Sequence, residues 1–360
     1  MKVTHLSLEH FRNIELARLQ FDPDRPVFFV GKNGQGKSNL LEALGLVTAI
    51  RSFRTHELAP MIQKKKRASR VLYKLLDERD EETEVELKIS SRKRSIMMDG
   101  MEVKRLSDYM GLFPSVVFSA DDNQLIKSGP QGRRRFFDLL YSVVDHEYLE
   151  SLQSYHRALK ERNHALKRQM DRPLVTVYDK ILARYGSVIM KKRTHWSERF
   201  VRLFETVYRQ IATEDESGSL AYRPALDVGA EEGFLEKLTH NYTRDCVLGT
   251  TSTGPHRDDF QFEVHDLGAR THGSDGQQRS LVLALKLAQI EFIEQKTQRK
   301  PILLLDDILG ELDNERKERF WKVFDHQCQI FGSGTAVPAI TFRQKWKVFT
   351  VDRGKFTELQ

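Results

Sequence analysis

Apolar and polar side chains alternate along much of the N-terminal third of the chain, as in strands that bury one face. The alternating segments are Val3–Phe11, Ile14–Phe21, Arg70–Leu76 and Glu84–Ser90. The apolar run Val27–Val30 predicts a short buried strand, and the stretch after it predicts a helix that begins near Lys37. Asp99-Gly100 separates two short strand-like segments, so we expect a tight hairpin there.

The pattern changes in the middle of the chain, where residues 133–207 are almost entirely helical in periodicity. Lys and Arg fill one side of this stretch, and larger side chains lie on the other side at Leu152, Tyr155, Leu159 and Leu166. Pro173 interrupts the periodicity, so we expect at least two long helices. The polar segment Thr213–Ser219 is expected to break the helical pattern.

Strand and helix patterns alternate again in the last third of the chain. The expected strands are Asp259–Val264, Ile302–Leu305, Cys328–Ser333 and Lys345–Val351, with helices after His272 and near Asn314–Asp325. The sequence therefore predicts an α/β domain built from both ends of the chain, with a helical domain inserted between them. The pattern places the α/β domain at 1–110 and 246–360 and the inserted helical domain at 111–245.

The composition is that of a folded chain with polyanionic partners. Of its 360 residues 39% are hydrophobic, which suffices for a core, and the length suggests about two domains. The net charge of +7 favours nucleic acid as a partner, although a solubilising surface would have the same balance.

Nothing in the sequence suggests export or membrane insertion. No apolar run approaches the ~18 residues of a membrane span, and the N-terminal segment lacks the apolar core of a signal peptide. Cys246 and Cys328 form no CxxC pair and predict neither a disulfide framework nor a zinc site. We therefore expect a protein of the reducing cytoplasm without a membrane partner.

The segment Gly31–Ser38, GKNGQGKS, matches the phosphate-loop pattern G-x-x-x-x-G-K-[ST] between a strand and a helix. Its backbone would surround the phosphates of ATP, with Lys37 at the β- and γ-phosphates and Ser38 as a ligand of Mg²⁺. The candidate ATP-binding residues here are Gly31, Lys32, Asn33, Gly34, Gln35, Gly36, Lys37, Ser38 and Asn39.

Two carboxylates follow the apolar strand at Ile302–Leu305, at the end where open α/β sheets bind ligands. Asp306 is the candidate Mg²⁺ partner, and Asp307 is placed to orient or deprotonate the attacking water. Asp also commonly caps helices, so this pair alone would be ambiguous. Together with the phosphate loop it favours a nucleotide site in which Lys37 and Asp307 are catalytic.

The segment HGSDGQQRS begins another helix with a second possible anion site at Ser274 and Gly276. A second phosphate-binding helix terminus is redundant if one nucleotide meets one copy of the chain. It becomes useful if two copies meet head to tail, so that Ser274 covers the γ-phosphate held by the other copy. A capped core helix after a flexible turn is the simpler alternative.

The order of GKNGQGKS, SDGQQ, LLLDD and GELD resembles the ABC-type ATPases of the SMC kind, as does EHFRNI near the N-terminus. Further segments are similar to one family within this group, the RecF family of bacterial recombination and repair proteins. They are SFRT (Ser52–Thr55), SGPQGRRRFFD (Ser128–Asp138), LKERNHALK (Leu159–Lys167) and GPHRDD (Gly254–Asp259). The resemblance extends over the whole chain.

The resemblance implies an SMC-like ABC-type P-loop ATPase domain with an inserted helical domain. It implies a DNA-binding protein of repair, recombination, replication-fork maintenance and the SOS response, which dimerises around two ATP molecules. It further implies binding to double-stranded DNA and single-/double-strand junctions, and loading of RecA onto gapped DNA with RecO and RecR. Slow, DNA-stimulated hydrolysis would release the dimer. Ser274, Gly276 and Gln277 would form the signature that acts on the ATP of the other copy, and Gly310–Asp313 would cross the dimer interface.

Four positions depart from common ABC patterns or are hard to assign. Asp307 stands where many ABC ATPases have Glu, and its shorter side chain suggests slow turnover. Gly310 replaces a frequent Ser. Thr335 stands near the position of the histidine switch of transporters, and Gln124 is a candidate for the glutamine loop.

Basic clusters could contact DNA or could be solvated surface: Lys64–Arg67, Arg92–Arg94, Arg133–Arg135 and Lys191–Arg193. Arg51 and Arg54, which follow the phosphate-loop helix, are candidates for contact with phosphate of DNA or ATP. His256–Asp258 has the composition of a hydrolytic site, but we favour a structural role in a turn. A transporter ATPase subunit and a small-molecule kinase are the alternative functions. The transporter explains neither the helical insertion nor the missing histidine switch, and the kinase leaves the Ser274 segment without a role and needs an acceptor pocket.

Overall fold

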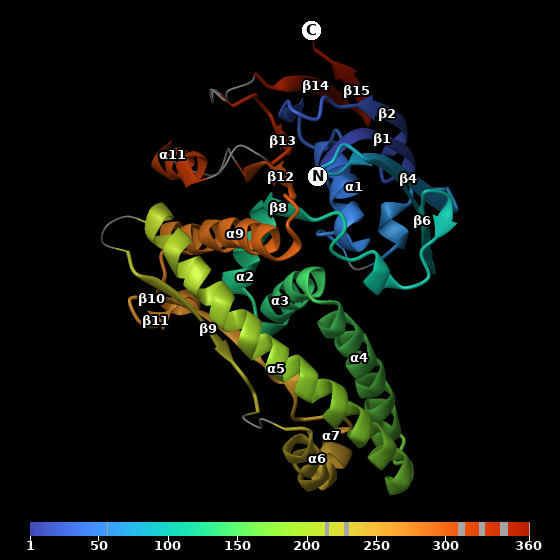
Figure 1. Ribbon diagram of the computed structural model, residues 1–360, viewed down its shortest axis with the longest axis vertical. Coiled ribbons are helices and arrows are strands. Elements are labelled where there is room, and N and C mark those ends of the chain that lie inside the picture. Colours follow the sequence, from blue (N-terminus) through green and yellow to red (C-terminus); the bar gives the residue numbers. More distant parts are fainter. Residues whose placement is uncertain are drawn as a thin grey trace. The chain divides into compact units, whose positions relative to one another are not determined.

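The structure, a computed structural model, describes residues 1–360 except 56, 213–215, 227–229, 309–313, 324–327, 339–344 and 360. It divides into two compact units. The sheet unit comprises Met1–Asp122 and Gln289–Gln360, and the helical unit comprises Asn123–Ala288 (Figure 1). The division at 110 and 245 that the sequence suggests stays a prediction, because periodicity and spatial compactness are different properties.

The first sheet of the sheet unit is mainly parallel, in the order β15-β14-β3-β13-β12-β8. Its strands are β3 (Val27–Val30), β8 (Ser115–Ser119), β12 (Ile302–Asp306), β13 (Ile330–Gly334), β14 (Lys347–Asp352) and β15 (Lys355–Glu358). Only β15 is antiparallel to its neighbour. The carboxyl ends of β3, β8, β12 and β13 therefore lie at one edge of the sheet.

The second sheet is antiparallel, in the order β2-β1-β4-β5-β6-β7. Its strands are β1 (Lys2–Phe11), β2 (Ile14–Gln20), β4 (Ala68–Leu76), β5 (Glu82–Ser90), β6 (Arg94–Met98) and β7 (Met101–Glu102). The hairpin predicted at Asp99-Gly100 is confirmed, because both residues have positive φ, 49° and 77°, and Met98 pairs with Met101.

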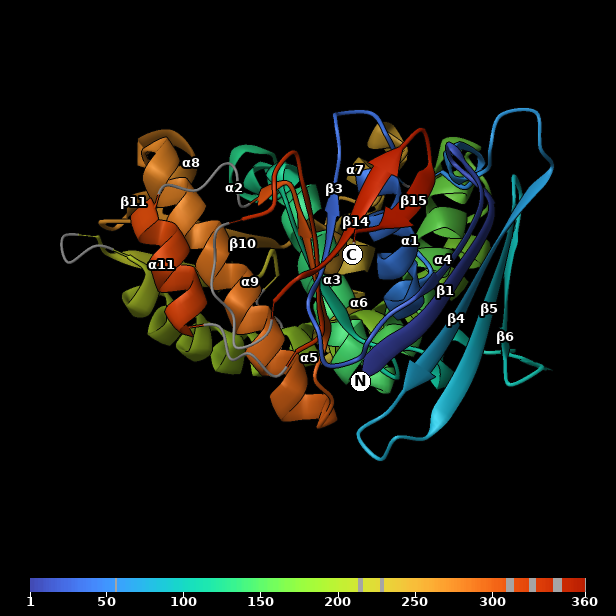
Figure 2. The same cartoon turned by 90° about the horizontal axis from the view of Figure 1, so that it is seen from above.

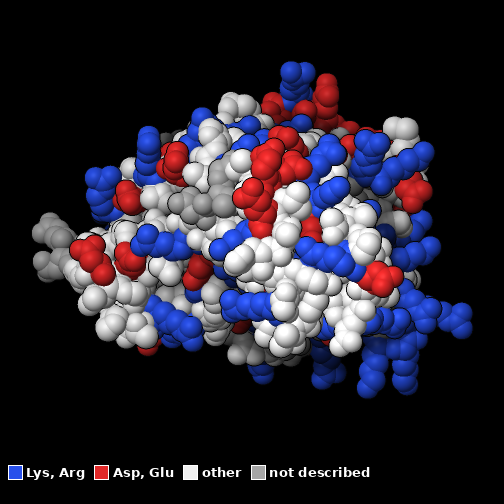
Figure 3. Space-filling view, turned by 90° about the horizontal axis from the view of Figure 1, so that it is seen from below, with Lys and Arg blue, Asp and Glu red and all other residues white. Residues whose placement is uncertain are grey.

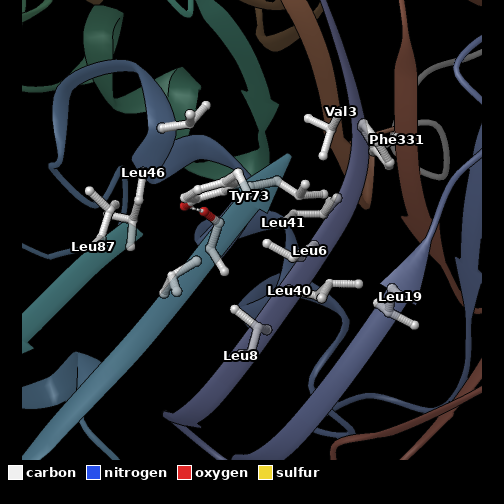
Figure 4. Close-up of a cluster of buried hydrophobic side chains, with 14 of the residues drawn as sticks. Val3, Leu6, Leu8, Leu19, Leu40, Leu41, Leu46, Tyr73, Leu87 and Phe331 are labelled. Carbon is white, nitrogen blue, oxygen red and sulfur yellow. Dashed lines mark hydrogen bonds between the residues drawn. The ribbon is translucent and has the colours of Figure 1, made fainter. Parts of the chain in front are cut away.

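Helix α1 (Lys37–Ala49) packs between the two sheets (Figure 2). Its leucines meet apolar side chains from both sheets, as Figure 4 shows for Leu40, Leu41 and Leu46. Two buried tyrosines, Tyr73 and Tyr109, donate their hydroxyls to carbonyl oxygens of α1. Because α1 is enclosed on nearly every side, it is apolar all round rather than amphipathic. Helix α11 (Asn314–Val323) also belongs to the sheet unit.

The helical unit contains three long helices, as the periodicity predicted, and a small sheet. Its helices are α2 (Gln124–Lys127), α3 (Pro130–Val144), α4 (His146–Lys167), α5 (Arg172–Ile211), α6 (Glu231–His240), α7 (Tyr242–Leu248), α8 (Ala269–His272) and the first part of α9 (Asp275–Thr297). Its strands are β9 (Gly218–Arg223), β10 (Asp259–Val264) and β11 (Leu267–Gly268). Among the described residues, no helix has the length and apolarity needed to cross a bilayer.

The interruptions predicted in this unit are partly confirmed. Pro173 lies in the first turn of α5, where its missing N–H costs no helical hydrogen bond. The polar break predicted over Thr213–Ser219 ends earlier than expected, because β9 begins at Gly218 and pairs with β10. Residues 213–215 lie outside the described residues.

A buried ion cluster joins three helices of the helical unit. Arg162 of α4 donates to Asp179 of α5 at 2.6 Å and to Asp245 of α7 at 2.7 Å. It also donates to the Thr251 hydroxyl at 2.8 Å, and all three charged side chains are fully buried. Since each charge lacks water, each depends on the others for compensation.

A second buried cluster surrounds Arg193 of α5. This guanidinium donates to Asp258 at 2.6 Å and to Asp138 at 2.7 Å. His256 lies in a hydrogen-bond pair with the Tyr155 hydroxyl at 2.7 Å, and its Nε2 lies 3.0 Å from the Thr251 carbonyl oxygen. The structural role expected for His256–Asp258 is confirmed, because these side chains hold a turn by buried hydrogen bonds.

Substitution of Arg162 tests the first cluster. Arg162→Ala would leave Asp179 and Asp245 buried and uncompensated, and we expect it to lower the free energy of unfolding by about 3–5 kcal/mol. Urea titration followed by circular dichroism measures this change. Lys160→Ala, an exposed position on the same helix, is the control and is expected to change stability by less than about 0.5 kcal/mol. Equal effects of the two substitutions would contradict a contribution of the buried cluster to stability.

His256 predicts a dependence of stability on pH. Burial, the main cause, lowers the pKa of His256 from its ordinary value of 6.5 to about 4. The unfolded chain therefore binds a proton more readily, and stability is lost as the pH falls from about 6.5 through about 4. The total contribution is about 3 kcal/mol. Unfolding measured across this range should show a shallower pH dependence for His256→Gln than for the wild type; parallel curves would refute the assignment.

Candidate nucleotide-binding site

The segment Gly31–Ser38 forms a tight loop between β3 and α1. Two of its glycines have positive φ, 78° at Gly34 and 116° at Gly36, in the region that glycine tolerates. A Cβ on Gly31 would lie 2.4 Å from the Val351 carbonyl oxygen, so this position accepts no side chain. The glycines therefore let the backbone turn closely enough to surround a phosphate group.

Neighbouring segments fix the conformation of the loop. The carbonyl oxygen of Gln35 accepts hydrogen bonds from the Gly354 N–H at 2.8 Å and from the Asn13 amide at 3.2 Å. The Gln35 side chain accepts a further bond from the Arg353 N–H at 2.8 Å. Gly36 occupies the N-cap of α1, where no side chain caps the helix. The first turn of α1 can therefore present its N–H groups and its positive dipole end to an anion.

Lys37 places its ammonium group inside the curve of the loop. Its Nζ donates to the carbonyl oxygens of Gly31 at 2.7 Å and Lys32 at 3.1 Å, and the residue is only 4% exposed. Carbonyl partners do not neutralise the ammonium charge. This charge can therefore interact with the phosphates of a bound nucleotide.

Asp306 ends β12 and meets Ser38 and Ser333 from neighbouring segments. The Ser333 hydroxyl donates to its Oδ1 at 2.9 Å. Burial raises the pKa of Asp306, while hydrogen bonds from both serines and the charge of Arg54 oppose the rise. A partly buried carboxylate beside a hydroxyl fits Mg²⁺, which prefers oxygen ligands and retains waters or phosphate oxygens for its other positions.

A pocket of about 470 Å³ opens at this edge of the parallel sheet. It is lined by Asn33, Ser38, Phe53, Arg54, Ser119, Ala120, Asp121, Asp306, Asp307 and Thr335. The phosphate loop and the Asp pair, predicted separately, are thus brought together by the carboxyl ends of parallel strands. Thr335, which the sequence placed near a switch position, also lines the pocket, whereas Ser119 and Asp121 carry no recognisable sequence signal.

Arg54 is held in this pocket by a buried carboxylate that the sequence did not single out. Glu42 of α1 is fully buried and accepts hydrogen bonds from Arg12, at 2.6 Å to Nη2, and from the Ser52 hydroxyl. Arg54 lies 3.6 Å from the same carboxylate and donates to Asn39 at 2.7 Å. The only signal in the sequence is one Glu within the otherwise apolar run Leu40–Val47.

Ser274 caps α9 by a reciprocal pair of hydrogen bonds. The Ser274 N–H donates to the Gln277 side chain at 2.9 Å, and the Gln277 N–H donates to the Ser274 hydroxyl at 3.2 Å. The capped helix that we considered as an alternative is therefore present. Ser274 is also exposed, and a hydroxyl that accepts one bond can still donate another. Capping and phosphate binding are therefore compatible.

Two other predicted segments have no place in the described site. Gly310–Asp313, expected to cross a dimer interface, lies outside the described residues. Gln124, the glutamine-loop candidate, begins α2 in the helical unit, and its role stays a prediction.

Comparison with known proteins agrees with the geometry of the site. The family described as "RecF/RecN/SMC N terminal domain" matches residues 2–342. A protein of Streptococcus agalactiae serotype Ia named "DNA replication and repair protein RecF" is 34% identical, over 98% of this chain and 97% of its own length. The protein of the same name from Macrococcus caseolyticus is 34% identical over 99% and 100% of the two chains.

Solved structures give the same result. One described as the recombination mediator protein RecF with ATP, in the RecFOR pathway, has a TM-score of 0.91 and 29% identity. The match covers 100% of this chain and 98% of the solved chain. An SMC head bound to a domain of ScpA has a TM-score of 0.56 at 16% identity and shares the fold alone. By its family match and its full-length relatives, this chain belongs to the RecF family and has the SMC-like ABC-type ATPase fold.

Proposed function

We propose that the chain is an ATP-dependent DNA-binding protein of recombinational repair and replication-fork maintenance. The observation that carries the proposal is the meeting of Ser38 and Asp306 at one pocket. The phosphate loop beside it holds the Lys37 ammonium group and leads into the start of α1, which no side chain caps. The relatives are named for DNA replication and repair, and one solved relative is described with ATP in the RecFOR pathway. The name of this pathway supports RecR and RecO as partners. The proposal further includes double-stranded DNA or junctions as the substrate and RecA loading onto gapped DNA as the outcome.

The residues of the pocket suggest how ATP would be bound. The N–H groups of the loop and the start of α1 would hold the phosphates, and Lys37 would add its charge at the β- and γ-phosphates. Ser38 and Asp306 would hold Mg²⁺, which would neutralise charge on the phosphate oxygens. Arg54, fixed by Glu42 and Asn39, would supply a second positive charge on the pocket wall.

Hydrolysis would use Asp307, which follows the metal-site carboxylate and lines the same pocket. A carboxylate can orient or deprotonate the attacking water. Because Asp is one methylene shorter than Glu, it would hold this water less closely, and slow hydrolysis follows. Slow turnover suits a switch whose ATP-bound state must last while the protein remains on DNA.

The switch itself would be dimerisation. Ser274, Gly276 and Gln277 would contact the γ-phosphate held by a second copy, which makes ATP part of the interface. The exposed hydroxyl of Ser274 and the start of the long helix α9 support this role. The names of the relatives favour this function over the transporter and kinase alternatives, because they concern DNA replication, repair and recombination.

Lys37→Ala tests the nucleotide site. This substitution removes the Lys37 ammonium group, which would donate charged hydrogen bonds to phosphate. ATP binding should therefore weaken by roughly 100-fold or more. Titration with a fluorescent ATP analogue measures the affinity. Lys355→Ala, exposed on β15, serves as the control and should bind as the wild type does. Unchanged binding by Lys37→Ala would refute the proposed site.

Substitutions of Ser274 separate nucleotide binding from dimerisation. Ser274→Arg should bind ATP normally yet fail to dimerise, which light scattering with ATP, with ADP and without nucleotide would show. Ser274→Asp is a sharper variant, because Asp keeps the helix cap but removes the hydroxyl donor and adds a charge that repels phosphate. If Ser274→Asp dimerised with ATP as the wild type does, the role of Ser274 would be confined to capping.

A further inference from the structure

Two basic segments far apart in the sequence meet at one end of the antiparallel sheet. Ala68, the first residue of β4, pairs with Ser90, the last residue of β5. This register brings Lys64–Arg67, which precede β4, beside Arg92–Arg94, which join β5 to β6. Figure 2 shows the start of β4, the end of β5 and the start of β6 at the same end of the sheet.

A third basic segment reaches this end through the next hairpin. The antiparallel pairing of β6 with β7 continues beyond β7, where the Val103 N–H donates to the Ile96 carbonyl at 3.0 Å. The chain therefore runs back toward the start of β6, and Lys104 and Arg105 follow directly. Both are exposed.

Arg94 anchors this end of the sheet to helix α1. Its guanidinium donates to the carbonyl oxygen of Ile50, the C-cap of α1. Burial, followed by repulsion from Arg51, lowers the pKa of Arg94, so several like charges share this region. We call the group the basic rim; it consists of Arg51, Lys64–Arg67, Arg92–Arg94, Lys104 and Arg105.

The basic rim differs from the rest of the sheet in lacking acidic partners. On the sheet face, Arg70 pairs with Glu86, and Lys74 pairs with Glu82 at 2.9 Å. Within the described part of the chain, no carboxylate lies at ion-pair distance from a side chain of the basic rim. Figure 3 draws one face of the molecule, on which mainly Lys and Arg side chains project at the lower right of the view. The residues of the rim are identified by the strand register and not by this view.

The other two basic clusters of the sequence do not form such a surface. Arg133 pairs with Asp259 at 2.8 Å, and Arg193 pairs with Asp258 at 2.6 Å. Both arginines are less than a tenth exposed. Their charges are therefore used inside the helical unit, which removes one end residue of each cluster from any external partner.

We infer that the basic rim contacts the phosphate backbone of double-stranded DNA without reading its sequence. The inference rests on the proposed DNA-binding function and locates its surface. Neighbouring strands lie about 4.8 Å apart, so the rim from β4 to β7 is on the order of 15 Å wide. Duplex DNA carries one charge per about 1.7 Å of axis, so several phosphates fit along the rim.

The composition of the rim favours this partner. Its exposed side chains are all Lys or Arg, which bind phosphate by charge, and the segments supply no aromatic side chain for stacking on unpaired bases. Gln63, which directly precedes the rim, has its side-chain oxygen in a hydrogen bond with His10 Nδ1 at 3.2 Å. The rim also lacks the exposed apolar side chains that would anchor it in a lipid surface.

The experiment neutralises four exposed residues of the rim in the full-length protein. The rim variant combines Lys64→Gln, Lys66→Gln, Arg92→Gln and Lys93→Gln, and fluorescence anisotropy with a labelled DNA duplex in the presence of ATP measures binding. We expect roughly 100-fold weaker binding at moderate salt. The slope of log affinity against log salt should become shallower by roughly 0.9 for each residue that contacts a phosphate.

A matched control removes the same number of charges from exposed positions of α5: Lys180→Gln, Arg184→Gln, Lys191→Gln and Arg202→Gln. Equal losses by both variants would mean that net charge alone acts, and wild-type DNA binding by the rim variant would also overturn the inference. Loss of binding to phosphatidylserine vesicles, with DNA binding retained, would assign the rim to a membrane instead. ATP binding and ATP-driven dimerisation are measured on the same samples. These two measurements test the proposed switch independently of DNA binding by the rim.

Discussion

The burial of α1 between two sheets is the constraint on which the rest of the sheet unit depends. A helix enclosed in this way must be apolar nearly all round, and its few polar side chains must find partners within the protein. Lys37 meets the carbonyls of its own loop, and Glu42 meets Arg12, Ser52 and Arg54. The same burial fixes the start of α1 against the carboxyl edge of the parallel sheet, so the phosphate loop and the metal-site carboxylate come from one packing arrangement.

This arrangement explains why the centre of the site could be predicted from the sequence. The phosphate loop is a local motif, since its glycines, lysine and serine have their roles within eight successive residues. Asp306 could be predicted because an apolar strand and the general rule for open α/β sheets place it at the binding edge. The alternating strands, the Asp99-Gly100 hairpin and the helix start at Lys37 are also determined by residues close to one another in the sequence. The structure confirms all three.

What could not be predicted depends on contacts between distant residues. The antiparallel sheet and the parallel sheet have similar strand patterns, so periodicity could not say which strands pair, or that β8 supplies Ser119 to the pocket. A run such as Arg133–Arg135 looks like a basic surface until its partner Asp259 is known, more than a hundred positions away. Conversely, Lys64–Arg67 and Arg92–Arg94 looked like separate clusters, and only the register of β4 with β5 makes them neighbours.

The buried cluster of Arg162, Asp179 and Asp245 has a consequence for how such a chain can change over generations. Exchange of one member leaves charge without a partner, whereas exchange of all three for apolar residues of similar volume is compatible with folding. Between these two states, every single step passes through a destabilised protein. The cost of each single exchange therefore couples the three positions, whereas exposed positions of the helical unit carry no such coupling.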